Sequence, residues 1–168
     1  MGHIVSHEGV KVDHNKIKVI KKWKIQTSIK HMWGFLGLTG YYHKFVKNYE
    51  KIVAPLTTLL KKDAFYWTPE ATKVFEHLKE ESQAQALAKP NFTKSFIVEC
   101  NASRNGICVI LMQEWRPISF DSHAIKGKYL HKPIYEKEML AILHVLKQWR
   151  PYLMGRDFKV KIDHDSLI

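Results

Sequence analysis

The sequence predicts an α+β protein, because a helical first part is followed by short strands and one long helix. Up to residue 89 the apolar residues recur at helical spacing, starting with Ile17, Ile20 and Trp23. After residue 94 apolar and polar residues alternate as in a strand. Between the helical pattern and the strand pattern, Lys89-Pro90-Asn91 breaks the regular secondary structure. We therefore predict a small helical segment at 1–89 and a partial mixed sheet with one long helix at 90–168.

Three helix starts can be identified in the first part. Asp13 and the pair Thr27-Ser28 are candidate N-caps, and Thr68 followed by Pro69 predicts a helix that runs to about residue 84. The helix after Ser28 is interrupted by glycines, which suggests close packing against a neighbour. These glycines are Gly34, Gly37 and Gly40.

The second part predicts four strands and a crossover helix. Three strands are expected at 95–100, 107–112 and 116–120, a helix from Pro133 to about Arg150, and a fourth strand at 158–162 that ends at Asp163. Three strands, a helix and a strand predict an antiparallel meander, with the last strand parallel to one already present.

Positive charge is concentrated in the first third of the chain. The whole chain carries +11, and residues 1–62 alone hold twelve lysines against three acidic residues, a net charge of +9. Such a field attracts polyanions, of which nucleic acid is the commonest. A lysine-rich solvated surface is the alternative interpretation.

Aromatic residues are mixed with lysines between residues 30 and 51. Aromatic rings can stack on bases while lysines hold phosphates, although aromatics at helical spacing more often form a core. The candidate nucleic-acid contacts are Lys30, Tyr41, Tyr42, Lys44 and Lys47.

Membrane insertion and secretion are not expected. No apolar run approaches the ~18 residues of a membrane span, and residues 1–12 contain no apolar signal region. Two cysteines, Cys100 and Cys108, are typical of a reducing compartment, and the strict geometry of a disulfide argues against a bond between them. We expect an intracellular protein, cytoplasmic or nuclear.

Several motifs resemble the Pol polyprotein of gypsy-type LTR retrotransposons. Residues 34–42 (GFLGLTGYY) and Phe45-Val46 resemble the reverse transcriptase thumb, and residues 52–60 (IVAPLTTLL) with Trp67-Thr68 resemble the connection. Residues 98–103, 135–143 (YEKEMLAIL) and 161–167 (KIDHDSL) resemble the RNase H domain. The resemblance implies a palm-end, thumb and connection remnant at 1–89 and a partial RNase H-like domain at 90–168.

The resemblance also implies which parts of the polyprotein are absent. Residues 2–6 resemble the last strand of the palm, so the polymerase aspartates would precede residue 1. The closing strand and helices of RNase H would follow Ile168. We therefore expect no polymerase site and an incomplete RNase H fold.

RNase H chemistry uses two Mg²⁺ ions about 4 Å apart, held by several carboxylates. The resemblance places the first three ligand positions at Asn101, Glu138 and Asp163, and the fourth beyond the last residue. The family has Asp at the first position, whereas Asn101 is neutral and ligates only through its carbonyl oxygen. We expect weak Mg²⁺ binding and strongly reduced hydrolysis, with Glu138 and Asp163 as the remaining metal ligands.

Other interpretations of these positions remain open. Without the resemblance, Glu138 is a first-turn helix carboxylate and Asp163 a strand-end acid. His164 follows Asp163 directly, but no His and Cys spacing typical of a metal site is found anywhere in the chain. Trp33 stands where the family usually has Arg, which removes one basic contact of the thumb.

Three functions are compatible with these observations. The first is a catalytically inactive retroelement fragment with residual affinity for nucleic acid, as RNA/DNA hybrid or duplex. The second is a nuclease or polymerase part that is active only when another chain completes it. The third is a non-enzymatic interaction module that forms oligomers through an exposed sheet edge.

Overall fold

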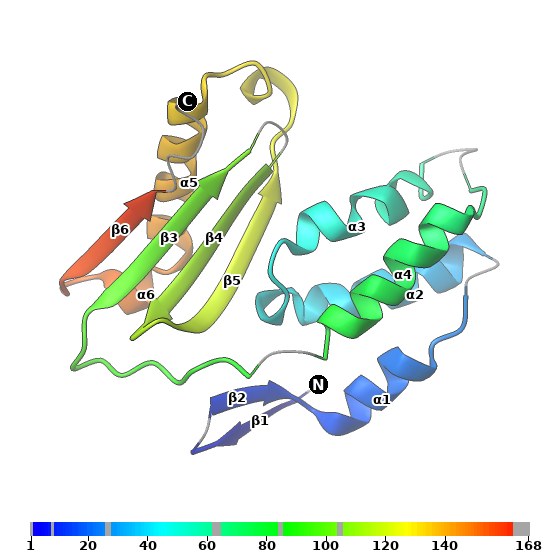
Figure 1. The fold of residues 1–168 in the computed structure, drawn as a ribbon, viewed down its shortest axis with the longest axis horizontal. Helices are drawn as coiled ribbons and strands as arrows, with labels where there is room; N and C mark the ends of the chain where they lie inside the picture. The colour runs from blue at the N-terminus through cyan, green and yellow to red at the C-terminus, as the bar shows by residue number, and fades with distance from the viewer. Residues whose placement is uncertain are drawn as a thin grey trace. The chain divides into compact units, whose positions relative to one another are not determined.

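The computed structural model describes residues 2–7, 9–25, 28–61, 65–83, 86–103 and 106–162. The chain divides into two compact units, unit 1 at Met1–Ala86 and unit 2 at Leu87–Ile168 (Figure 1). Unit 1 is mainly helical and unit 2 holds a mixed sheet, so the predicted α+β class is confirmed. The units meet three residues before the predicted boundary at 89, and their assignment to separate functional domains stays a prediction.

Unit 1 begins with a hairpin and continues as helices. Strands β1 (His3–Ser6) and β2 (Gly9–Val12) pair antiparallel. The helices are α1 (His14–Lys22), α2 (Ile29–Tyr41), the 3-10 turn η1 (His43–Phe45), α3 (Tyr49–Thr58) and α4 (Pro69–Glu81). Helix α4 ends at Glu81, three residues before its predicted end.

The predicted helix starts are confirmed by the hydrogen bonds of their caps. The backbone N–H groups of a first helical turn have no partner within the helix, and a side-chain oxygen can accept from one of them. The Asp13 carboxylate accepts from the N–H of Asn15 at 2.8 Å, and the Thr68 hydroxyl accepts from the N–H of Ala71 at 3.1 Å. The Ser28 hydroxyl accepts from the N–H of His31 at 3.4 Å.

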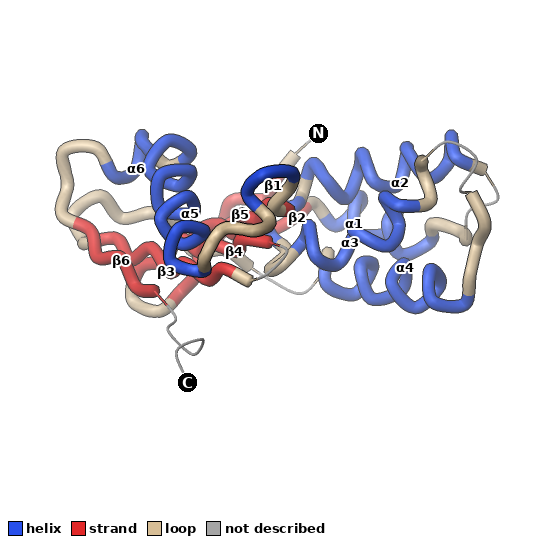
Figure 2. Tube along the Cα trace, turned by 90° about the horizontal axis from the view of Figure 1, so that it is seen from above, coloured by secondary structure: helices blue, strands red, loops and turns tan. Residues whose placement is uncertain are grey.

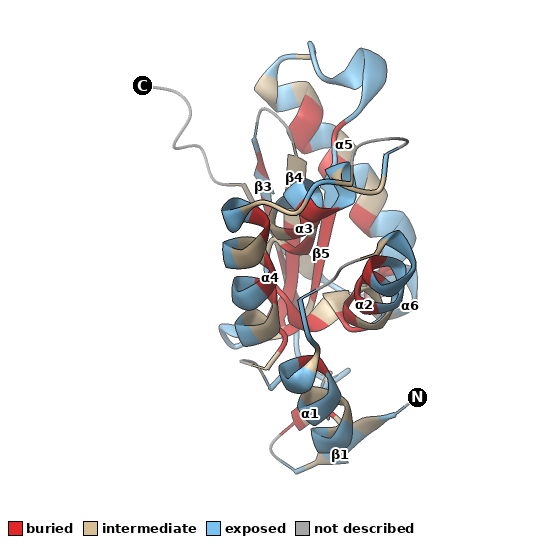
Figure 3. Ribbon diagram, turned by 90° about the vertical axis from the view of Figure 1, so that its right-hand side faces the viewer, coloured by how far each residue is buried: buried red, intermediate tan, exposed pale blue. Residues whose placement is uncertain are grey.

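The core of unit 1 is aromatic. The rings of Phe35 and Phe75 are fully buried, with 4.4 Å between their centroids. Figure 3 shows the buried parts of α2 and α4 in red. Gly34 lies under Trp23, where an added Cβ would be 3.4 Å from the indole ring. An added Cβ at Gly40 would lie 3.3 Å from the hydroxyl of Tyr49. The close packing predicted for the glycines of α2 is thus present at these two positions.

Unit 2 is a four-stranded sheet with helices on one face (Figure 2). The strands are β3 (Phe96–Ala102), β4 (Gly106–Gln113), β5 (Arg116–Ala124) and β6 (Phe158–Ile162), in the order β5-β4-β3-β6. After the 3-10 turn η2 (Gly127–Tyr129), helices α5 (Ile134–Gln148) and α6 (Arg150–Leu153) lead to β6. Strand β6 runs parallel to β3, and the other pairs are antiparallel, as predicted.

The core of unit 2 lies between the sheet and α5. Cys100, Val109 and Leu111 of the sheet pack with Ala141 and Val145 of α5. Within the described sheet β5 and β6 are the edge strands, and oligomerisation through such an edge stays a prediction.

Both cysteines of unit 2 are free thiols. Cys100 pairs with Val109 in the register of β3 and β4, whereas Cys108 pairs with Asn101. Successive residues of a strand alternate between faces, so the two thiols point to opposite sides of the sheet. Among the described helices, none is both long and apolar enough to cross a bilayer.

Candidate functional site

Asn101 lies near the end of β3, opposite Cys108 of β4. Its side chain is exposed, whereas the preceding residue, Cys100, is fully buried in the core. The alternation of the strand therefore turns Asn101 away from that core. Asn101 offers one neutral carbonyl oxygen as a metal ligand.

Glu138 is buried against the sheet. It is the fifth residue of α5, only 5% exposed, and Glu136 is the acidic residue of the first turn. The pKa of the Cys100 thiol is raised to about 11, first by burial and then by negative charge at Glu138, Cys108 and Glu99. Glu138 is therefore a buried carboxylate whose charge acts on Cys100 of β3, and Glu136 takes the first-turn position that the alternative interpretation gave to Glu138.

Asp163 lies outside the described residues. The strand that leads to it, β6, pairs in parallel with β3 and places Ile162 opposite Cys100. The described part of β6 thus ends opposite Cys100, which is one residue before Asn101 on β3.

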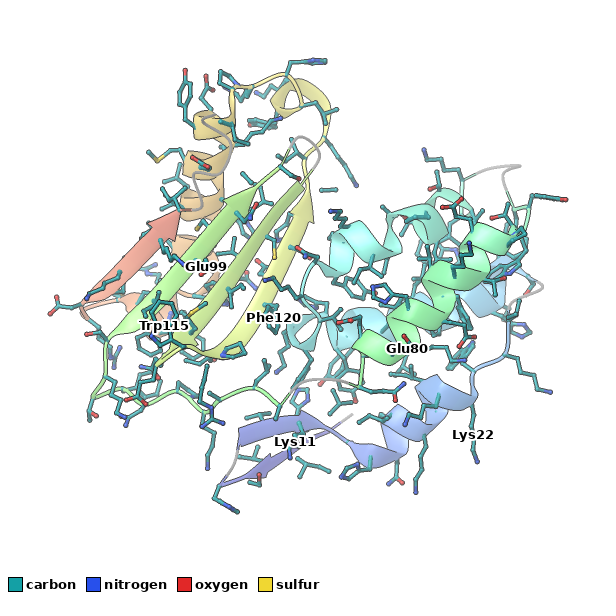
Figure 4. The ribbon with its side chains drawn as sticks, viewed as in Figure 1. Lys11, Lys22, Glu80, Glu99, Trp115 and Phe120 are labelled. Atoms are coloured by element: carbon teal, nitrogen blue, oxygen red, sulfur yellow. The ribbon has the colours of Figure 1, made fainter. Side chains whose placement is uncertain are left out.

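The described donors at this position do not fit two Mg²⁺ ions. They comprise the carboxylate of Glu138 and the neutral amide oxygen of Asn101, whereas two dications require several carboxylates. Glu99, labelled in Figure 4, lies on the same face of β3 as Asn101. Its carboxylate is 3.4 Å from the ammonium of Lys161. We derive no hydrolytic step from this set of residues.

A second group of potential ligands lies between β5 and α5. The Asp121 carboxylate accepts hydrogen bonds from Nε2 of His144 at 2.9 Å and from Nε2 of His123 at 3.2 Å. One ligand atom from each residue lies within 4.8 Å of the others. Asp121 is buried, whereas the two imidazoles are half exposed.

Electrostatics at Asp121 favour its charged form. Burial tends to raise the pKa of this carboxyl, but the hydrogen bonds and charges of His123 and His144 outweigh burial and hold the pKa below its ordinary value. The search for short-range His and Cys spacing missed this group, because His144 is far from Asp121 and His123 in sequence. The available signal in the sequence was that Asp121 and His123 are alternate residues of one strand, so their side chains lie on the same face.

The candidate nucleic-acid contacts of unit 1 differ in exposure. Lys30, Tyr41 and Lys47 are exposed, and Lys44 is half-buried with its ammonium 5.3 Å from the centroid of the Phe45 ring. Burial lowers the pKa of Lys44. Tyr42 is fully buried and its hydroxyl donates to the carbonyl of Gly2 at 3.4 Å. Of the two tyrosines, only Tyr41 presents its ring to solvent.

An open groove runs along α2 and α3. It has a volume of about 450 Å³, and Trp33, Gly37 and Gly40 of α2 line it together with Tyr49 and Val53 of α3. Trp33 is 60% exposed, and a Cβ added at Gly37 would meet no atom within 4 Å. The sequence alone indicated Trp33 only as a lost basic contact and contained no signal for this groove.

Comparison with known families and structures is consistent with this arrangement. Residues 67–160 match the family described as the RNase H-like domain found in reverse transcriptase. A likeness in structure is found with the foamy viral protease-reverse transcriptase solved in complex with an RNA/DNA hybrid, with a TM-score of 0.86 over 96% of this chain and 23% of that chain. The sequence identity there is 21%, so this likeness concerns the fold.

Curated relatives are polyproteins of transposable elements. The retrovirus-related Pol polyprotein from transposon 297 of Drosophila melanogaster is 39% identical over 170 residues, which is 99% of this chain and 16% of that protein. The transposon Tf2-3 polyprotein of Schizosaccharomyces pombe is 31% identical over 182 residues, which is 100% of this chain and 13% of that protein. The chain thus spans between about one eighth and one sixth of the length of these relatives.

Proposed function

The chain belongs to the family of the RNase H-like domain found in reverse transcriptase, and on that premise we propose that it binds nucleic acid as part of a retroelement Pol protein. The main support for this proposal is the exposed face of α2, where Trp33, Gly37 and Tyr41 follow one another at four-residue spacing. Residues four apart lie on one face of a helix.

This face combines the two features that nucleic-acid binding needs. Two exposed rings flank a glycine without a side chain, so a ribose or a base edge can approach the helix backbone and stack on the rings. The lysines of the first third, among them Lys30 and Lys47, supply a field that attracts phosphates. Related structures were solved with an RNA/DNA hybrid and with double-stranded DNA, and either is a suitable ligand to test.

Hydrolysis of the hybrid is strongly reduced under this proposal. Glu138 and Asp163 are the proposed metal ligands, and Asn101 replaces the carboxylate that would bridge two Mg²⁺ ions. The loss of one negative charge weakens binding of a dication directly. The two free cysteines of unit 2 fit the intracellular compartment that we propose for the protein.

Salt dependence of binding tests the proposal. The affinity of the full chain for a labelled RNA/DNA hybrid is measured by fluorescence anisotropy at 50 and 200 mM salt. With about four phosphates neutralised, we expect a loss of affinity of about a hundredfold. An affinity that does not change with salt, or the absence of saturable binding at 50 mM, would overturn the proposal.

Substitutions at Gly37 test the location of the site. Gly37→Leu is expected to weaken hybrid binding about tenfold, because the side chain fills the space between Trp33 and Tyr41. Gly37→Ala is the matched control, since it adds a single methyl in open space and raises helix propensity by about 1 kcal/mol. Equal affinities of the unmodified chain and Gly37→Leu for the hybrid would show that the binding site does not lie on this face of α2.

A further inference from the structure

We propose that Asp121, His123 and His144 form a Zn²⁺ site that joins β5 to α5. The three residues are other than the RNase H ligand positions, and the inference does not depend on nucleic-acid binding. It rests on the positions of the three ligand atoms, on the chemistry of the donors and on the secondary structure that holds them.

The separations of the ligand atoms match those of a zinc site. Bonds of about 2.0–2.1 Å to nitrogen and oxygen place the corners of a tetrahedron about 3.3 Å apart. The Asp121 carboxylate oxygen lies 2.9 Å from Nε2 of His144 and 3.2 Å from Nε2 of His123. The two imidazole rings meet edge to face, with 4.1 Å between their centroids. All three ligand atoms lie within 4.8 Å of one another, so we infer that side-chain rotation can bring them to one ion.

The donor set favours zinc over magnesium. Imidazole nitrogen is a good ligand for Zn²⁺, whereas Mg²⁺ prefers oxygen donors in octahedral geometry. Each neutral imidazole carries one proton, which moves from Nε2 to Nδ1 when Nε2 takes up the metal, so no proton has to leave the ring. The buried carboxylate of Asp121 supplies negative charge that partly neutralises the ion.

Regular secondary structure holds the three ligands in place. Asp121 and His123 are alternate residues of β5 and project from the same face of the strand, which is the face that packs against α5. His144 lies beside the buried residue Val145 on α5. With two histidines half exposed, an ion can enter from solvent and a water molecule can occupy the fourth position.

Calorimetric titration tests the proposal directly. The full chain is treated with a chelator, dialysed and titrated with ZnCl₂. We expect binding of one ion per chain that millimolar Mg²⁺ does not displace. His144→Gln and Asp121→Asn are expected to weaken this binding at least a hundredfold, while the side-chain amides of both variants preserve a hydrogen bond between β5 and α5.

His131→Gln is the matched control, because His131 is an exposed histidine of the same unit outside the cluster. Binding equally strong in His144→Gln, binding equally weakened in His131→Gln, or no saturable binding would overturn the proposal. If a variant of the cluster fails to fold, the proposal is tested by the visible absorption spectrum of Co²⁺ added to the unmodified chain. Intense visible absorption typical of four-coordinate Co²⁺ supports the site, and the weak spectrum of hydrated Co²⁺ refutes it.

Discussion

Unit 1 and unit 2 have comparably buried cores but differ in how much of their proposed chemistry depends on single residues. Unit 1 contains the basic third of the chain, with a net charge of +9 over residues 1–62, and an exposed aromatic face on α2. Its proposed binding is shared among many lysines and rings. In unit 2 the proposed Mg²⁺ site depends on a few carboxylates, so a single neutral residue at Asn101 would change its donor set.

The difference shows which functions survive sequence change. Electrostatic attraction to phosphates sums over many charges, so losing one lysine or one arginine costs a fraction of the affinity. A two-metal site needs each carboxylate at its place, because the ions must be neutralised and positioned together. Under our proposal this chain keeps its fold and its nucleic-acid binding surface, while its hydrolytic site is weakened.

Core truncations give the largest expected effects and test whether the two cores are comparable. Phe35→Ala in unit 1 and Leu111→Ala in unit 2 remove fully buried side chains and should each cost about 2–5 kcal/mol of unfolding free energy. Urea unfolding measures the loss, and hydrogen exchange locates it in α2 and α4 or in β3 and β4. If either substitution left the unfolding free energy unchanged, the two cores would not be comparable.

Thiol reactivity sharpens the contrast between the two faces of the sheet in unit 2. Cys100 is buried and its pKa is about 11, so little thiolate exists at pH 8, whereas Cys108 is partly exposed. We expect iodoacetamide to modify Cys108 at least about a hundredfold faster than Cys100, because the thiolate is the reactive form. Mass spectrometry of the peptides measures both rates, and similar rates would contradict the described register.

Restoring a carboxylate at Asn101 tests why the RNase H ligand positions of unit 2 are expected to bind Mg²⁺ weakly. Asn101→Asp adds one negative charge and should raise Mg²⁺ affinity about tenfold, or about 1.4 kcal/mol. The gain should disappear in the double variant with Glu138→Gln. Calorimetry measures both, and an unchanged Mg²⁺ affinity in Asn101→Asp would mean that the position does not contribute to a metal site.

Single lysine substitutions give the smallest expected effect. Lys47→Gln should weaken hybrid binding about two- to fourfold and reduce the slope of log affinity against log salt by about 0.9, the share of one phosphate contact. Lys147→Gln, an exposed lysine on α5, is the control. A larger loss for Lys147→Gln would place the main binding surface on unit 2.

Local patterns of residues were sufficient to predict the class of fold and most of its elements. Side-chain caps at Asp13, Ser28 and Thr68 act within a few residues, so local chemistry was enough to place the helix starts. The alternation of Phe96, Val98 and Cys100 likewise identified β3. The resemblance of its motifs also identified the family, whereas the ligand roles of Asn101, Glu138 and Asp163 stay predictions.

Which side chains meet depends on the packing of segments that are distant in sequence. Tyr41 and Tyr42 are neighbours in sequence, yet the end of α2 exposes one and buries the other. His144 reaches Asp121 because α5 crosses the face of the sheet from which Asp121 projects. The groove at Gly37 exists because α3 packs beside α2. Such contacts depend on how distant segments pack, and no local pattern of residues encodes them by itself.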